Sequence, residues 1–170
     1  MNDFKSGIFN KKEIPRLQKW YQIDGKYFSK TWKIKYDRWE SFKYDDYLLN
    51  IQNRIEDISC KLLNKDISFN SCLINLYRNE NDSIRPHSDS ETSFGDNPDI
   101  SVLSLGETRE IFFKRKIFNK DNLKSTKADK SKENLDFSLK LESGSLLIMS
   151  GSTQKYFFHY IPKENNKKEK

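Results

Sequence analysis

The sequence FNSCLINLYRNENDSIRPHSDSE, residues Phe69–Glu91, changes character halfway along and indicates how this chain folds. Its first nine residues, Phe69–Tyr77, are apolar and bounded by polar residues, which is typical of a short β-strand. The second half is polar and charged and contains His87-Ser-Asp89. Because residues i and i+2 of an extended chain project from the same face, we expect His87 and Asp89 to lie side by side.

Short strand-like segments continue through the rest of the chain, separated by turns at Gly106-Glu-Thr and Glu142-Ser-Gly144. A parallel α/β sheet needs helical crossovers between its strands, and the sequence predicts none after Cys60. The pattern therefore favours a mainly β (α+β) protein built as an antiparallel sandwich or jelly roll. The expected strands after the first are Asp99–Gly106, Arg109–Phe118, Asp136–Leu141, Ser145–Ser150 and Gln154–Ile161.

One helix is predicted before these strands, over residues 44–60. Four apolar side chains recur there at steps of three and four residues, as on one face of a helix; they are Leu48, Ile51, Ile55 and Ile58. The region before the helix, about 10–40, carries turn signals and many aromatic residues. We expect one domain over 1–170, with a β core over 67–162, a lysine-rich flexible loop over 119–135 and a charged tail over 163–170.

Composition narrows the function classes. The formal net charge is +6, which is compatible with a polyanionic partner such as nucleic acid, although the excess lysines of the loop and tail are equally typical of solvated surface. The two cysteines, Cys60 and Cys72, cannot form a secreted disulfide framework, and we expect free buried thiols. Nothing resembles a signal peptide or a transmembrane run, which predicts a soluble, intracellular protein without a membrane partner.

The sequence contains two histidines, His87 and His159, and the second lies near the end of the last expected strand. Two imidazoles and one carboxylate on one face of a metal form the facial triad of non-haem Fe(II) oxygenases. From the residues alone, a turn histidine and a half-buried strand histidine remain equally compatible with these positions. The two histidines therefore suggest a metal site, and the neighbouring sequence is needed to decide between a metal site and two structural histidines.

Those surroundings resemble AlkB-type dioxygenases, the Fe(II)- and 2-oxoglutarate-dependent enzymes that dealkylate nucleic acids. The resemblance rests on the combination of N-x-Y, H-x-D, G-x-L-L-x-M and a following H, and it also includes ISVLSLGETREIFFKRK. Upstream, IPRLQKWYQIDGKYFSK is similar to the family's nucleotide-recognition lid. The resemblance implies a double-stranded β-helix (jelly roll) with an N-terminal lid and a flanking helix.

The same resemblance implies the cofactor sites. It assigns His87, Asp89 and His159 to Fe(II), and Asn75 and Tyr77, the N-x-Y pair, to 2-oxoglutarate, with dioxygen as the second co-substrate. Without the resemblance, the amide of the pair would be interpreted as a strand-edge group and its tyrosine as a core aromatic.

It also implies a base pocket. Glu91 matches an acidic position that faces the target base, and Phe28 matches a lid aromatic that stacks on it. Arg16 and Tyr21 match lid positions that hold the nucleic-acid strand. Phe28 and Tyr21 are also compatible with ordinary core packing. Lys26 departs from the family, whose members carry an aromatic residue there.

The implied activity is oxidative demethylation of bases such as 1-methyladenine or 3-methylcytosine in DNA or RNA, with release of formaldehyde. We expect the protein to be a monomer. A base inside a duplex must be extruded to react, or be single-stranded already. Two alternatives stay open: a catalytically impaired or truncated relative that binds nucleic acid, and a dioxygenase acting on another kind of substrate.

One family feature is missing. Members carry an arginine after the second histidine, on a strand of the R-x-N-L-T-x-R kind, that pairs with the far carboxylate of 2-oxoglutarate. This sequence ends at PKENNKKEK, and no arginine follows Arg115. We expect an incomplete chain, a truncated gene, or substitution by Arg109 or a tail lysine, and a lysine replaces a bidentate guanidinium poorly. The final strand is therefore expected to be absent.

Overall fold

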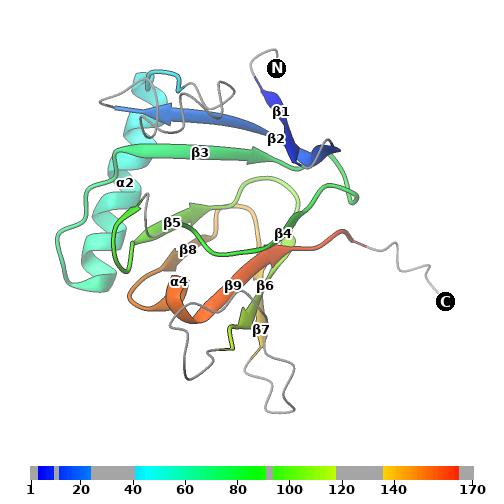
Figure 1. Cartoon of the computed structure of the whole chain (residues 1–170). Helices are drawn as coiled ribbons and strands as arrows, with labels where there is room; N and C mark the ends of the chain where they lie inside the picture. The colour runs from blue at the N-terminus through cyan, green and yellow to red at the C-terminus, as the bar shows by residue number, and fades with distance from the viewer. Residues whose placement is uncertain (1–3, 10–11, 24–40, 91–93, 118–135, 165–170) are drawn as a thin grey trace. The chain divides into compact units, whose positions relative to one another are not determined.

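A computed structural model gives the structure of the chain, and Figure 1 traces it from the N-terminus to the C-terminus. The chain divides into two compact units, Met1–Asp82 and Ser83–Lys170, and each is described by itself. The expected mainly β class is confirmed, whereas a single domain over 1–170 stays a prediction. Within the residues described, no helix is both long and apolar enough to cross a membrane. The structure describes residues 4–9, 12–23, 41–90, 94–117 and 136–164.

The first unit contains a three-stranded antiparallel sheet in the order β1-β2-β3 (Figure 1). Strand β3, Ser71–Leu76, lies inside the strand predicted over Phe69–Tyr77. Strands β1, Lys5–Phe9, and β2, Lys12–Gln22, were not predicted, because β2 contains a proline and its buried positions include the polar Gln18. Such a strand lacks the apolar alternation by which strands are recognised.

The predicted helix is α2, Asp46–Leu63. Asp45 caps its N-terminus: the Asp45 carboxylate accepts a hydrogen bond of 2.7 Å from the backbone N–H of Leu48, which satisfies one of the unpaired amides of the first turn. Asn64 caps its C-terminus in the left-handed conformation, with φ of 50°. The helix therefore exists where the periodicity placed it, shifted by two to three residues.

The buried face of α2 is more polar than its apolar stripe suggested. The prediction is wrong for Ile58, which is 38% exposed, whereas Gln52 and Ser59 are buried. The Gln52 amide donates to the backbone carbonyl of Phe69 at 2.7 Å, and the Glu56 carboxylate accepts from the Phe69 N–H at 2.6 Å. These bonds tie the start of the segment leading into β3 to the helix, which explains why a polar side chain is buried there.

The second unit contains a four-stranded antiparallel sheet, order β4-β9-β6-β7, and a two-stranded sheet, β5-β8 (Figure 1). The predicted strands are confirmed except for the last. Its first residues form a helical turn, α4, Thr153–Tyr156, and only Phe157–Ile161 is strand β9. The other strands are β4 Ile84–His87, β5 Ile100–Leu103, β6 Arg109–Arg115, β7 Phe137–Leu141 and β8 Leu146–Met149.

The core of this unit draws side chains from both sheets. Ile111 and Phe113 of β6, Leu141 of β7 and Met149 of β8 form one buried cluster. Along β6 burial alternates residue by residue, so one face of the strand points into the core, as in a half-buried antiparallel strand. The face that carries Phe113 also carries the residue paired with it on β9, His159. The predicted loop 119–135 and most of the tail 163–170 lie outside the described residues.

Candidate metal centre

Strands β4 and β9 bring the two histidines together within the second unit. His87 and His159 are partners in the antiparallel register of these strands, and their ring centroids are 4.3 Å apart. Asp89 follows β4 by two residues, and one ligand atom from each of the three side chains lies within 4.8 Å of the others. His87, Asp89 and His159 therefore lie together as predicted, although His87 and His159 are 72 residues apart in the sequence.

The local backbone fixes the tautomer of His87. Its Nδ1 lies 2.8 Å from the carbonyl oxygen of Arg85. Because a carbonyl can only accept, Nδ1 must carry the proton and donate it, which leaves the lone pair on Nε2. Metal-binding histidines are commonly oriented in this way by a hydrogen bond on the other ring nitrogen.

Burial sets the charge of the other two groups. Burial, together with the nearby His87 and the positive charge of Lys116, lowers the pKa of His159 to about 3, so its imidazole is neutral near pH 7. Burial also raises the pKa of Asp89, and His87 opposes this shift. The distance of 3.7 Å between His159 Nε2 and Asp89 Oδ2 therefore joins a neutral ring to a carboxyl group and is not an ion pair.

This donor set fits Fe(II). Two imidazole nitrogens and one carboxylate oxygen are the ligands of the facial triad, and a dication would compensate the half-buried charge of Asp89. Phe113, which is 2% exposed, borders the site, with its ring centroid 6.2 Å from that of His159. The centre thus lies at the edge of the apolar core rather than among solvated side chains.

The predicted 2-oxoglutarate residues lie in the first unit. The amide oxygen of Asn75 accepts hydrogen bonds of 2.9 Å from Arg16 Nε and from Gln18 Nε2, across the β2–β3 pair. Arg16 and Asn75, which were predicted for different roles, are therefore in contact. Tyr77 follows β3 directly and is half-buried.

Among the predicted substrate residues, Tyr21 belongs to an aromatic cluster. Its ring centroid is 6.0 Å from those of Phe42 and of Tyr44, and the Lys19 ammonium lies 5.2 Å from it. The predictions for Phe28 and Glu91, and the departure at Lys26, lie outside the described residues.

Arg109, proposed from the sequence as one substitute for the missing arginine, already has partners in the second unit. Its Nη2 donates to the backbone carbonyl of Pro162 at 2.7 Å, and its Nε lies 3.3 Å from the Glu164 carboxylate. Its side chain is 9% exposed. Arg109 thus holds the chain that leaves β9, and recruiting it to a co-substrate would require giving up the pair with Glu164.

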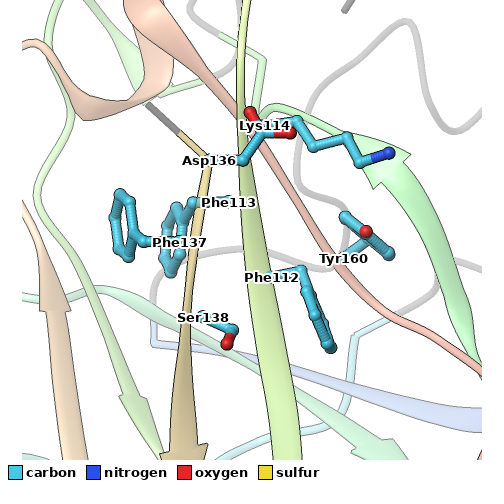
Figure 2. Close-up of a pocket in the computed structure, with 7 residues that line it drawn as sticks. All are labelled: Phe112, Phe113, Lys114, Asp136, Phe137, Ser138 and Tyr160. Carbon is cyan, nitrogen blue, oxygen red and sulfur yellow. The ribbon is translucent and has the colours of Figure 1, made fainter. Parts of the chain in front are cut away.

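A shallow cavity of about 200 Å³ lies at the β6–β7 side of the same unit. Figure 2 shows Phe113 and Phe137 on one side of the β6 ribbon and Phe112 and Tyr160 on the other. None of the residues predicted for metal, co-substrate or base lines it. The remaining lining residues are Lys114, Asp136 and Ser138.

Two residues near the metal centre were missed by the sequence analysis. Gln154 accepts a hydrogen bond from the backbone of Asp89, and Lys116 donates one to Ser88. The sequence predicts a strand at each position, Arg109–Phe118 around Lys116 and Gln154–Ile161 at Gln154, and no spacing rule links either residue to the His-x-Asp segment. The contacts arise from tertiary structure, so only the fold reveals them.

Comparison with known proteins agrees with this donor set. The profile of the 2OG-Fe(II) oxygenase superfamily matches residues 2–170, and the chain belongs to this superfamily. The family uses 2-oxoglutarate and Fe(II), with dioxygen as the other co-substrate, in agreement with the predicted cofactors.

Within the superfamily, the chain is similar to AlkB-type proteins, which confirms the resemblance seen in the sequence. It is 37% identical over 155 residues to the α-ketoglutarate-dependent dioxygenase alkB homolog 3 of Bos taurus and 36% identical to that of Homo sapiens, covering 91% of this chain and 48% of each relative. It is 33% identical over 103 residues to the DNA oxidative demethylase ALKBH2 of Arabidopsis thaliana, covering 56% of this chain and 33% of that protein. The chain spans about half the length of the alkB homolog 3 proteins that it matches.

Proposed function

We propose that this chain is the oxygenase part of an enzyme that oxidatively removes methyl groups from alkylated bases of the 1-methyladenine or 3-methylcytosine type, in DNA or RNA. The observation that carries the proposal is the convergence of His87, Asp89 and His159 in a chain that matches the superfamily over its whole length. Similarity to a DNA oxidative demethylase supports the substrate class.

His87 Nε2, His159 Nε2 and the Asp89 carboxylate would hold the metal. Bound Fe(II), with 2-oxoglutarate and dioxygen, supplies the oxidising chemistry. The protein's part is to present these donors in a fixed arrangement: the Arg85 carbonyl orients one imidazole, and burial keeps the other neutral. The apolar border at Phe113 limits access of water to this side of the centre.

Asn75 and Tyr77 are proposed as contacts for 2-oxoglutarate. We also propose that the chain forms a single catalytic domain and that its core is a double-stranded β-helix. The spacing of two supports the co-substrate contacts, because the two positions share one face of the extended segment that leads toward the His-x-Asp segment. If so, Asn75→Ala should raise the KM for 2-oxoglutarate about tenfold or more, because a desolvated hydrogen-bonding group is lost. An unchanged KM would remove Asn75 from the co-substrate site.

Arg16, Tyr21, Phe28 and Glu91 are proposed for the nucleic acid, as parts of an N-terminal lid. The cationic and aromatic character of the described lid residues suits a strand gripped by phosphate contacts and stacking. The net charge of +6 supports a polyanionic partner. Binding of a methylated oligonucleotide should accordingly weaken as salt is raised.

We further propose a monomer that works inside the cell. The free thiols Cys60 and Cys72 suit a reducing compartment. Gel filtration with light scattering at working concentration tests the oligomeric state.

The test of the activity is succinate production from 2-oxoglutarate with Fe(II) and ascorbate, with and without a 1-methyladenine oligonucleotide, alongside the His87→Ala variant. Succinate and formaldehyde that depend on both the oligonucleotide and His87 would support the proposal. Oligonucleotide binding without turnover would favour a non-catalytic binder, and turnover without oligonucleotide binding would favour another substrate.

A further inference from the structure

The backbone of the metal-binding segment is held by a buried side chain from another element. Gln154, on α4, is 2% exposed, and its Oε1 accepts a hydrogen bond of 2.9 Å from the backbone N–H of Asp89. Its Nε2 lies 3.6 Å from Met149 Sδ in the core. Because α4 runs directly into β9, the same residue ties the carboxylate ligand Asp89 to the element that carries His159.

A buried cation braces the same segment. Lys116, just after β6, is 9% exposed. Its Nζ donates to Ser88 Oγ at 2.8 Å and to the backbone carbonyl of Gln154 at 2.6 Å, and it lies 4.9 Å from the Phe158 ring centroid. Lysine is among the residues least often buried, and burying an ammonium is costly unless hydrogen bonds compensate, which the contacts with Ser88 and Gln154 provide.

The two contacts act on adjacent residues. Ser88 stands between the two ligands of the His-x-Asp segment, where an extended chain directs its side chain away from theirs. Lys116 therefore holds the middle residue through its hydroxyl, while Gln154 holds the backbone of the next. Together with the Lys116–Gln154 bond, the contacts close a network that joins the end of β6, the segment after β4, and α4.

We propose that Lys116 and Gln154 are positioning residues of the metal centre, which fix the Ser88–Asp89 backbone so that the Asp89 carboxylate faces the two imidazoles before metal binds. This inference rests on the metal site of the proposed function. Without the network, the segment after β4 would sample other conformations, and metal binding would have to order it. Groups that orient ligands typically contribute about 10–100-fold to metal affinity.

The test measures Co(II) affinity of the full chain without co-substrate, together with thermal unfolding of the metal-free protein. Gln154→Met removes the acceptor for the Asp89 amide at similar side-chain length, and Lys116→Met removes the ammonium and keeps the apolar stem. Each should weaken Co(II) binding about tenfold or more. The matched controls are Lys114→Met and Gln52→Met. In the wild-type protein the Lys114 ammonium lies 5.4 Å from the Tyr160 ring centroid, and Gln52 is a buried glutamine of the first unit.

The controls separate positioning from general stability. Gln52→Met should lower the melting temperature and leave Co(II) affinity within about twofold of wild type, because its hydrogen bond to the Phe69 carbonyl joins α2 to the segment before β3 and involves no metal ligand. If the Gln154 or Lys116 variants fold and bind Co(II) as tightly as wild type, the proposal is wrong. If they do not fold, Ser88→Ala and Ser88→Thr replace them, and affinity must fall for the alanine and be retained for the threonine, which keeps the hydroxyl.

The metal assignment itself is tested in the same experiment. Wild-type protein that does not bind Co(II), or His87→Ala protein that binds it normally, would overturn the metal site. Binding that is lost in His87→Ala but unchanged in the Lys116, Gln154 and Ser88 variants would overturn only their positioning role.

Discussion

Phe113 and His159 are register partners across the β6–β9 pair, with ring centroids 6.2 Å apart. Phe113 belongs to the buried cluster of the second unit, and His159 is a proposed metal ligand. The ligand is therefore packed against the core, so the position of its imidazole depends on how well the core is filled.

Phe113→Ala is expected to lower the free energy of unfolding by about 3–5 kcal/mol, because it leaves a cavity at a fully buried aromatic site. Affinity for Co(II) should fall as well, since the His159 ring loses its packing partner. Urea denaturation and Co(II) titration measure the two effects. Leu105→Ala, at a side chain 71% exposed, is the control and should change stability by less than about 0.5 kcal/mol.

Asp89→Asn should separate metal binding from stability. The carboxylate is half-buried, its charge is disfavoured by burial, and the nearby His159 imidazole is neutral, so removing the charge should leave the metal-free protein at least as stable as wild type. Co(II) affinity should fall about 100-fold or more, because the anionic ligand is lost. Thermal unfolding with and without Co(II) measures both effects.

Asp82→Asn is the matched comparison. Asp82 is 3% exposed, but it accepts hydrogen bonds from the Arg78 guanidinium at 2.8 and 2.9 Å and from the Arg78 backbone N–H. Its substitution should destabilise the protein and leave Co(II) binding intact. A metal-free Asp89→Asn protein that is destabilised as much as Asp82→Asn would show that Asp89 is a structural carboxylate.

The sequence predicted the elements whose periodicity is strong and missed those built from polar side chains. The helix was found from the periodicity of its apolar residues, even though its buried residues are Gln52 and Ser59, and the apolar strands were found from their short apolar runs between turns. Strands β1 and β2 were missed because β2 buries the polar Gln18 as well as Trp20. Helix α4 was missed because it leads directly into the aromatic residues of β9, and nearly the whole segment was predicted to be one strand. The metal triad was predicted because it needs particular residue types, whereas the supporting contacts of Gln154 depend on distances that only the fold determines.

The N-cap of α2 offers a local test of helix formation. Asp45→Ala should lower the free energy of unfolding by about 1 kcal/mol, because the Leu48 amide loses its acceptor. Asp45→Asn keeps a side-chain acceptor and should cost much less. Urea denaturation of the two variants compares them, and equal losses would mean that the charge of Asp45, rather than its hydrogen bond, supports the helix.

The last prediction concerns the thiol of Cys72 on β3. Burial raises the pKa of this thiol from 9.0 to about 11, so the protonated form is favoured in the folded state. Up to about pH 9 both states keep the proton; between about pH 9 and about pH 11 the unfolded chain ionises first, so stability should fall across this window. Cys72→Ala should make the decline shallower.

Thiol reactivity checks the same shift independently. In a Cys60→Ser background at pH 8, alkylation of Cys72 by iodoacetamide should be at least about tenfold slower in the folded protein than in urea, because less thiolate is present and the group is half-buried. Equal rates in the two states would mean that β3 opens readily. In that case the hydrogen bonds from Arg16 and Gln18 to Asn75 on the same strand could not hold the proposed co-substrate contact in place.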